Sequence, residues 1–359
     1  MSESKQWRSR ALFRLTVAAF TIVVIQAASA AADPPVHPNL LVVEDVAALR
    51  SAVGQGGPIY VQPGTYRLSQ PLAIETPVHL VMDREARLVA DWDNQPSQGV
   101  VYVTRGADGS RLDGIRIDGN GNRLQGIRLA NVADVQLKNL EIVNLGEQGI
   151  MVSGSQRVLI QDVHLERTQT HDDTSQIGAV RVASSRDVVI ERVHVHDTGG
   201  KGIAFGNSRR CVLRDSVVHD TQRDAGDGIY FNNSHHISVY RCTVLDPQGN
   251  ALKISRRSSH IRVRDCWLEQ HRGVGVGLFI QGGIKCHVTD SRIQNERGGN
   301  AVQVSQHPLK GAGGPAVDNV IVGNHLVSSR GHFFGEGAEN VRGTVVANNV
   351  YVRPEDDER

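Results

Sequence analysis

The sequence predicts an all-β solenoid: a parallel β-helix with three strands per coil. A sequence repeat of about 24 residues recurs between residues 126 and 332. Each copy holds three short segments in which apolar and polar residues alternate, separated by polar turns. Such alternation is typical of strands with one buried face. One copy cannot bury that face alone, so the copies must stack. A leucine-rich repeat is disfavoured because no segment has apolar residues at helical spacing over a sufficient length. A propeller is disfavoured because its blades need about 40 residues each.

Most copies open on a small residue followed by an apolar strand. They begin at Gly126, Gly149, Gly178, Gly202, Gly228, Ala251 and Gly277, with a degenerate copy from Ala301. In the second copy we expect strands at residues 150–152, 158–160 and 163–165. Stacking places equivalent residues of successive copies above one another, so that each sequence column becomes a surface ridge.

The ends of the chain differ from the repeats. Residues 1–30 carry a basic start, a short apolar core and a small-x-small pattern, which indicates a signal peptide. Residues 31–42 are interpreted as a linker, residues 43–350 as the β-helix domain and residues 351–359 as a charged tail. Asp45 is expected to cap a short helix with Val46, Leu49 and Val53 on one face, which would cover the open end of the solenoid.

Composition limits the partners of the chain. Lys and Arg total 39 and Asp and Glu total 38, so no global charge recruits nucleic acid or an anionic membrane. We expect a secreted or periplasmic monomer with no membrane span in the mature chain. Cys242 and Cys266 share an inward column at a separation that allows a disulfide, but we interpret all four cysteines as small buried hydrophobes.

The first coils carry a recognisable motif. They contain Gly56-Gly57, Ile59, Val61, then Pro63-Gly64-Thr65-Tyr66 and Pro71-Leu72. This stretch resembles the opening of pectate-lyase-like right-handed β-helix proteins, and with the repeats the resemblance covers roughly residues 43–350. The resemblance implies a right-handed helix, in accord with the general bias of parallel crossovers. The superfamily holds lyases, hydrolases, epimerases, esterases and adhesins, so the resemblance implies no single activity.

One column combines charge, a phenol and the longest loops. The first strand of each copy presents one outward residue, and these residues are Met151, Arg181, Ala204, Tyr230, Lys253, Phe279 and Gln303. The residues expected just before this strand are Gln148, Ile177, Lys201, Asp227, Asn250 and Val276. The turns entering it are longest at residues 168–177 and 221–227, and variable loops beside a regular sheet usually carry function. In the resembling enzymes the substrate groove lies in this same place.

We therefore predict an extended site for a polysaccharide, which suits a long ridge better than a small molecule does. The candidate catalytic residues are Lys253, Arg181, Tyr230, Asp227 and Lys201. The candidate substrate-binding residues are His171, Arg223, Arg256 and Phe279. The candidate metal ligands are Asp172, Asp173 and Asp224, whose carboxylates are of the kind that Ca²⁺ prefers.

Three reaction classes suit these residues. Elimination from a uronic acid polymer needs a cation or Ca²⁺ to neutralise the substrate carboxylate and a base to remove the C5 proton. C5 epimerisation needs the same groups. Glycoside hydrolysis needs two carboxylates, such as Asp227 with Asp224 or Asp173. A non-catalytic scaffold that binds polysaccharide is the remaining alternative, and low aromatic content disfavours it.

Two further resemblances separate these classes. Residues 251–259 resemble the strand and basic turn of chondroitinase B-like and alginate lyases, which implies a base at Lys253 and a substrate contact at Arg256 or Arg257. The polygalacturonase set is incomplete, since the chain has Asp172-Asp173 but no Gly-His-Gly and no Arg-Ile-Lys. We therefore favour a lyase over a hydrolase.

Three other columns are interpreted as structural. One lies near the second turn and alternates in sign in part, which favours solvated ion pairs: Asn139, Asp162, Arg192, Asp215, Arg241, Asp265 and Asp290. A second consists of Asn144, Asp197, Asp220 and Asp246 at a turn, where Asn and Asp serve backbone needs. His164 and His194, with Glu166, His196 and His219, are interpreted as surface ladder residues rather than catalytic ones.

Overall fold

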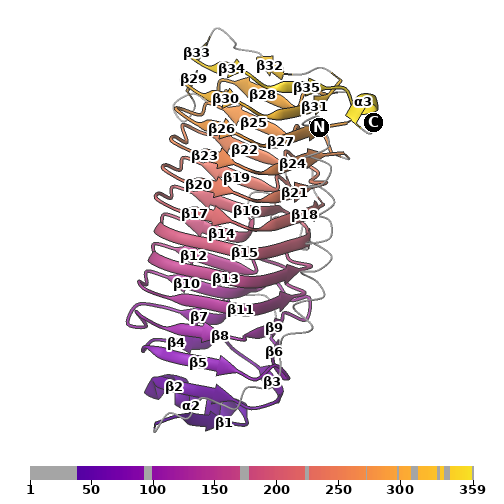
Figure 1. Cartoon of the computed structure of the whole chain (residues 1–359). Helices are drawn as coiled ribbons and strands as arrows, with labels where there is room; N and C mark the ends of the chain where they lie inside the picture. The colour runs from indigo at the N-terminus through magenta and orange to yellow at the C-terminus, as the bar shows by residue number, and fades with distance from the viewer. Residues whose placement is uncertain are drawn as a thin grey trace, which may run out of the picture. The chain divides into compact units, whose positions relative to one another are not determined.

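Parallel strands, stacked coil upon coil, make up nearly all of the regular structure. The computed structural model describes residues 39–92, 99–169, 178–222, 226–271, 273–296, 299–308, 314–329, 332–334 and 340–357. Residues 41–359 form one compact unit. The coils of this unit follow one another along a single axis from β1 to β35 (Figure 1). The expected signal peptide lies outside the described residues.

Three ladders of parallel strands run along the solenoid. Ladder 1 carries the first strand of each coil: β4 (Leu72–Ile74), β7 (Gly99–Val103), β10 (Gln125–Ala130), β12 (Ile150–Ser153), β14 (Gly178–Ala183), β16 (Lys201–Gly206), β19 (Ile229–Asn232), β22 (Leu252–Ser255), β25 (Leu278–Gln281), β28 (Val302–Ser305) and β32 (His332–Phe334).

Ladder 2 follows the first turn of each coil. It consists of β1 (Leu41–Val43), β2 (Gly57–Val61), β5 (Val78–Met82), β8 (Arg111–Asp113), β11 (Gln136–Val143), β13 (Gln156–Glu166), β15 (Arg186–Thr198), β17 (Val212–Arg214), β20 (Ser238–Tyr240), β23 (Arg262–Arg264), β26 (His287–Thr289), β30 (Val320–Val322) and β34 (Val345–Ala347). The pair β29 (Ala316–Val317) and β33 (Val341–Arg342) lies in the turn before it.

Ladder 3 completes each coil, and the long strands β11, β13 and β15 run from ladder 2 into it. Its other members are β3 (Gly64–Leu68), β6 (Ala86–Ala90), β9 (Arg116–Asp118), β18 (Val217–Thr221), β21 (Thr243–Leu245), β24 (Trp267–Gln270), β27 (Arg292–Asn295), β31 (His325–Ser328) and β35 (Val350–Val352). The prediction of three strands per coil is confirmed, with the second and third joined in the central coils.

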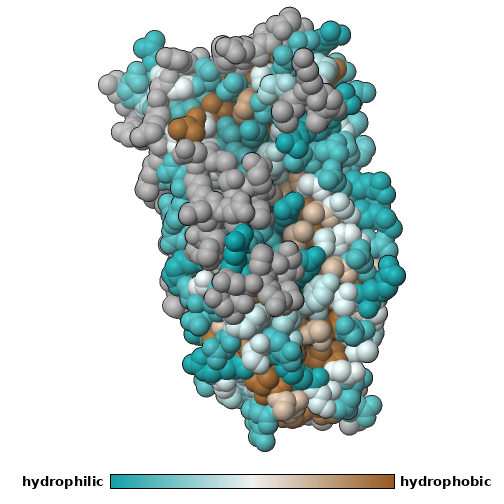
Figure 2. Space-filling model, turned by 180° about the vertical axis from the view of Figure 1, so that it is seen from behind, coloured by the Kyte–Doolittle hydropathy of each residue, from teal (hydrophilic) through white to brown (hydrophobic). Residues whose placement is uncertain are grey.

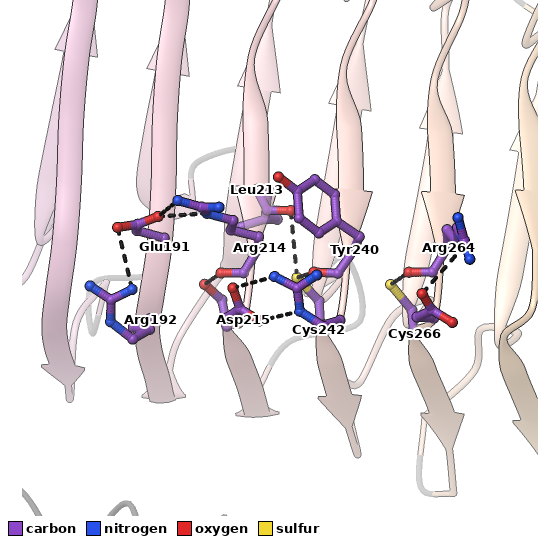
Figure 3. A network of polar contacts seen from close by, with 12 residues as sticks. Glu191, Arg192, Leu213, Arg214, Asp215, Tyr240, Cys242, Arg264 and Cys266 are labelled. Carbon is purple, nitrogen blue, oxygen red and sulfur yellow. Dashed lines mark hydrogen bonds and ion pairs between the residues drawn. The ribbon is translucent and has the colours of Figure 1, made fainter.

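A left-handed backbone residue bends the chain between ladders 2 and 3. Every residue of the column near the second turn has a φ between 52° and 55°: Asn139, Asp162, Arg192, Asp215, Arg241, Asp265 and Asp290. Asn and Asp tolerate this conformation. The column also forms the predicted ion pairs, since Arg192 Nε lies 2.6 Å from Asp162 Oδ1 and Arg241 Nε lies 2.6 Å from Asp215 Oδ1. Figure 3 shows part of this network across neighbouring strands.

The second predicted turn column is also confirmed. Asn144, Asp197, Asp220 and Asp246 all adopt a positive φ, between 48° and 57°. The four cysteines are buried and free, so they pack as small hydrophobes and the allowed bridge between Cys242 and Cys266 is not formed. Burial raises the pKa of the Cys211 thiol to about 11 and that of Cys286 to about 12, which makes both unreactive.

A helix covers the first coils as expected. In α2 (Val46–Gln55), Asp45 is the N-cap and its Oδ1 accepts a hydrogen bond of 2.7 Å from the backbone N–H of Ala48. Leu49 and Val53 are buried in the core, and the helix packs against β1, β2, β3 and β4. Among the described residues, no helix has the length and apolar character that a membrane span requires.

Two boundaries differ from the expected ones. Strand β1 begins at Leu41, within the segment interpreted as a linker, because it pairs with β2 and joins the core through Val43. The expected charged tail contains the end of β35 and the short helix α3 (Pro354–Asp357), whose Asp357 pairs with Arg292 of β27.

On the face seen in Figure 2, hydrophobic and hydrophilic residues are mixed.

Candidate functional site

The outward residues of ladder 1 stack as the sequence predicts. Backbone pairing puts Met151 beside Arg181, then Ala204, Tyr230, Lys253, Phe279 and Gln303 in turn. We call this column the ridge. It also includes Tyr102 and Arg128, which the sequence analysis missed although Arg128 has the same phase in its copy. Arg128 Cζ lies 5.7 Å from the centroid of the Tyr102 ring.

The position that precedes the strand forms a second column beside the ridge. Lys201 pairs with Asp227 in the register of β16 and β19, and one coil earlier its partner is Gly178. We expected Ile177 at that place, which was one residue out of register. Ile177 itself lies outside the described residues.

Asp227 is buried and held by the next coil. It is only 4% exposed, and its Oδ1 accepts hydrogen bonds from the backbone N–H of Asn250 at 3.0 Å and from Asn250 Nδ2 at 2.7 Å. Asn250 Oδ1 in turn accepts from the backbone N–H of Val276 at 3.1 Å. A carboxylate fixed by such bonds provides an oriented negative charge beside the ridge.

Lys201 and Tyr230 form the centre of the site. Lys201 is 2% exposed and its Nζ lies 4.9 Å from the centroid of the Tyr230 ring. Burial lowers the pKa of the Lys201 ammonium, Asp227 opposes this shift, and the cations Lys253 and Arg181 reinforce it. Burial raises the pKa of the Tyr230 phenol, while its hydrogen bond with Ser255 acts in the opposite direction. One group is thus biased toward losing its proton and the other toward keeping it.

Cations flank this centre along the ridge. Arg181 lies two coils before Tyr230, and burial lowers the pKa of its guanidinium. Lys253 lies in the coil after Tyr230, with Nζ 5.1 Å from the centroid of the Phe279 ring. Arg256 follows the end of β22, and its charge acts on the Tyr230 phenol. The structure therefore brings together the five predicted catalytic residues and two of the predicted substrate-binding residues.

The remaining predicted residues lie in segments that the structure does not describe. These are His171, Asp172, Asp173, Arg223 and Asp224. They belong to the two long turns expected beside the ridge, so the calcium hypothesis rests on residues outside the described ranges. A polar hollow lined by Asp108, Asn131, Gln156, Arg186 and Arg209 lies at the turn between ladders 1 and 2.

The comparisons with known proteins support the fold. The model of the right handed beta helix region matches residues 97–226 and 173–310, which together exceed half of the chain. The chain belongs to this family. Among curated proteins, none matches the sequence.

Solved structures share the architecture at low identity. The A-module of mannuronan C-5 epimerase AlgE4 from Azotobacter vinelandii superposes with a TM-score of 0.64 at 15% identity, over 88% of this chain and 94% of that one. An exopolygalacturonase from Thermotoga maritima gives 0.56 at 12%, over 89% and 93%. The adhesin PfbA of Streptococcus pneumoniae gives 0.55 at 12%, over 86% and 93%. At such identities the likeness shows the fold alone.

Proposed function

We propose that this protein is an exported enzyme that acts on a uronic-acid-containing polysaccharide, most simply as a β-eliminative lyase. The observation that carries the proposal is the cluster on ladder 1. Lys201 and Lys253 lie in the coils on either side of Tyr230, Arg181 lies one coil beyond Lys201, and Asp227 is buried in the column beside the ridge. Cations spaced along several coils suit the repeated carboxylates of a polyuronate chain. Two of the structural neighbours are, by name, an epimerase of mannuronan and a polygalacturonase.

The proposed chemistry assigns a role to each group. Lys253 binds and neutralises the carboxylate of the reacting uronate, which makes the adjacent C5 proton more acidic. Arg181, three coils away, binds the carboxylate of another residue of the same polymer chain. Lys201, whose pKa is lowered, accepts that proton in its neutral form. Tyr230, whose pKa is raised, donates a proton to the leaving glycosidic oxygen as the C4–O bond breaks and the C4–C5 double bond forms. Asp227 stabilises the ammonium that forms when Lys201 takes up the proton. Phe279 and Arg256 extend the binding surface.

C5 epimerisation is the second candidate, because the same pair of groups on opposite faces of the sugar would exchange the C5 proton without breaking a bond in the chain. The epimerase among the structural neighbours favours its inclusion. A Ca²⁺ ion held by Asp172, Asp173 and Asp224 remains part of the proposal. Loss of turnover on chelation, with recovery on adding Ca²⁺, would support it.

The test is product analysis on a panel of polyuronates. Elimination gives a conjugated unsaturated uronate that absorbs in the ultraviolet; hydrolysis gives reducing ends without that chromophore, and epimerisation changes the sugar NMR signals without shortening the chain. We expect Tyr230→Phe to lower turnover by about 10²–10⁴-fold and Arg262→Ala, which removes an exposed cation of ladder 2, to leave it unchanged. Polymer binding without turnover in the wild-type protein across the panel would refute the enzyme and favour a scaffold.

A further inference from the structure

Four histidines gather on the outer face of ladder 3, away from the ridge. His164 of β13 pairs in register with His194 of β15, and Glu166 of β13 pairs with His196 of β15 and through it with His219 of β18. Their ring centroids lie 5.0–5.3 Å apart. The repeat phase predicted this stack, which we interpreted as a surface ladder. The contacts between the side chains divide it into two unlike halves.

The first half is closed by hydrogen bonds. His194 Nε2 lies 2.9 Å from His219 Nε2, and His219 Nδ1 lies 2.8 Å from Asp220 Oδ2. Both distances are ordinary for hydrogen bonds. If His219 Nδ1–H donates to Asp220, His219 Nε2 is free to accept a hydrogen bond from His194 Nε2–H. The hydrogen-bonding groups of this half are therefore paired with one another.

The second half has a different geometry. His164 Nε2 and His196 Nε2 are 3.4 Å apart, which is longer than a good hydrogen bond. Glu166 Oε2 lies 3.7 Å from His164 Nε2 and 3.8 Å from His196 Nε2. Its other carboxylate oxygen pairs with Arg167, which leaves Oε2 directed at the two imidazoles. Three ligand atoms of the types that bind transition metals therefore lie within 4.8 Å of one another, close enough to hold one ion.

The size of this triangle matches a metal ion. A point equidistant from the three atoms lies about 2.1 Å from each, and Zn²⁺ bonds to imidazole nitrogen and carboxylate oxygen measure about 2.0–2.2 Å. In a tetrahedral site, ligand atoms at that bond length are about 3.3–3.4 Å apart. The observed separations need only small side-chain adjustments to reach this arrangement.

The protonation state also suits coordination. Burial, reinforced by the neighbouring histidines, lowers the pKa of His196 to about 4. Burial also lowers the pKa of His164. Neutral imidazole is the form that binds metals. The side chains of His164, Glu166 and His196 are 33%, 22% and 20% exposed, so an ion can enter from solvent and keep water as its remaining ligand.

We propose that His164, Glu166 and His196 bind a divalent first-row transition-metal ion, for which Zn²⁺ serves as the probe, at a site on ladder 3 that is separate from the ridge. Two imidazoles and one carboxylate with an open position favour such an ion over Ca²⁺, which takes six to eight oxygen ligands. The ligands come from the adjacent strands β13 and β15, so a bound ion cross-links two coils.

The test is isothermal titration of the tag-free full chain with Zn²⁺ at neutral pH, with Ca²⁺ titrated in parallel. We expect one Zn²⁺ per chain, no Ca²⁺ heat that depends on these residues, and a rise in the thermal midpoint with Zn²⁺. His196→Gln and Glu166→Gln should each weaken Zn²⁺ binding by at least about tenfold. Co²⁺ in the wild-type protein should show the visible absorption of a four-coordinate site.

The matched control is His260→Gln. His260 stacks on His236 with ring centroids 4.4 Å apart, and the groups that act on its pKa, besides burial, are two histidines and the cations Lys285 and Arg262. This variant should bind Zn²⁺ as the wild type does. The proposal fails if the wild-type chain binds no Zn²⁺, or if His196→Gln and Glu166→Gln, each shown to be folded by circular dichroism, bind it as tightly as His260→Gln.

Discussion

At the scale of single residues, the site depends on opposite effects of burial on two neighbouring groups. Burial disfavours the charged form of each, so it lowers the pKa of Lys201 and raises that of Tyr230. Their 4.9 Å contact keeps the ammonium against the ring face while the amine is protonated. The phenol and the amine therefore differ in proton affinity from the same groups in water, as an acid and a base must at one site.

The pH dependence of turnover tests these roles. We expect kcat/KM to rise with pH until Lys201 has lost its proton, at lower pH than for a free lysine, and to fall once Tyr230 ionises, at higher pH than for a free tyrosine. Tyr230→Phe should lower kcat by about 10²–10⁴-fold. The measurement is a pH–rate profile of wild type and of Lys201→Arg. Retention of the acidic limb in an active Lys201→Arg variant would contradict the role of Lys201 as base.

At the scale of the repeat, the glycine that opens several copies is explained by close approach. A Cβ on Gly228 would lie 2.2 Å from Val244 Cγ1 of ladder 3 and 2.8 Å from the backbone oxygen of Ala251 in the next coil. At Gly228 the start of ladder 1 therefore passes close to Val244, and a Cβ there requires a neighbour to move. Later coils make room for Ala251 and Ala301 at the equivalent position. By contrast, a Cβ on Gly206 at the end of β16 meets nothing within 4 Å.

These two glycines give a matched pair for stability. Gly228→Ala should destabilise the fold by about 1–3 kcal/mol, because overpacking moves the backbone or Val244. Gly206→Ala should change the free energy of unfolding by less than about 0.5 kcal/mol. Urea denaturation of both variants checks this. Equal stability of the two would show that the repeat glycine has no packing role.

At the scale of the whole β-helix, each coil is stabilised by its contacts with the coils on either side. The first coil has a neighbour on one side only, so its exposed core needs a cover. The helix α2 provides it with Leu49, which is 0% exposed, and Val53. Ladder 1 carries the candidate enzymatic site and ladder 3 the histidines, so two surfaces of one solenoid can have separate roles.

The cover is tested by Leu49→Ala. We expect the free energy of unfolding to fall by about 2–5 kcal/mol, because the change leaves a cavity between the helix and the core. Ser51→Ala, at an exposed position of the same helix, should lie within about 0.5 kcal/mol of wild type. Chemical denaturation followed by far-ultraviolet circular dichroism measures both. A Leu49→Ala variant as stable as Ser51→Ala would mean that α2 does not seal the core.

Much of this architecture could be predicted, because strand alternation and the repeat define the columns. The ridge from Met151 to Gln303 and the turn column of Asn144, Asp197, Asp220 and Asp246 followed from phase alone. For the column from Asn139 to Asp290 the phase predicted ion pairs but not the left-handed backbone. The register before Gly178 did not, since the preceding insertion hides where the strand begins. The approach of His164 Nε2, His196 Nε2 and Glu166 Oε2 was also beyond prediction. It depends on side-chain rotamers that bring the diagonal neighbours His164 and His196 together beside Glu166, the direct partner of His196.

The most direct test of the account measures polyuronate binding by variants that each lack one cation. Calorimetry at two salt concentrations gives the affinities. Arg181→Gln and Lys253→Gln remove charges from the ridge, three coils apart, whereas Arg262→Gln removes one from ladder 2. We predict that the two ridge variants each bind about tenfold more weakly and lose part of the salt dependence, while Arg262→Gln binds as the wild type does. Equal affinity of all three variants and the wild type would contradict a polysaccharide site on ladder 1.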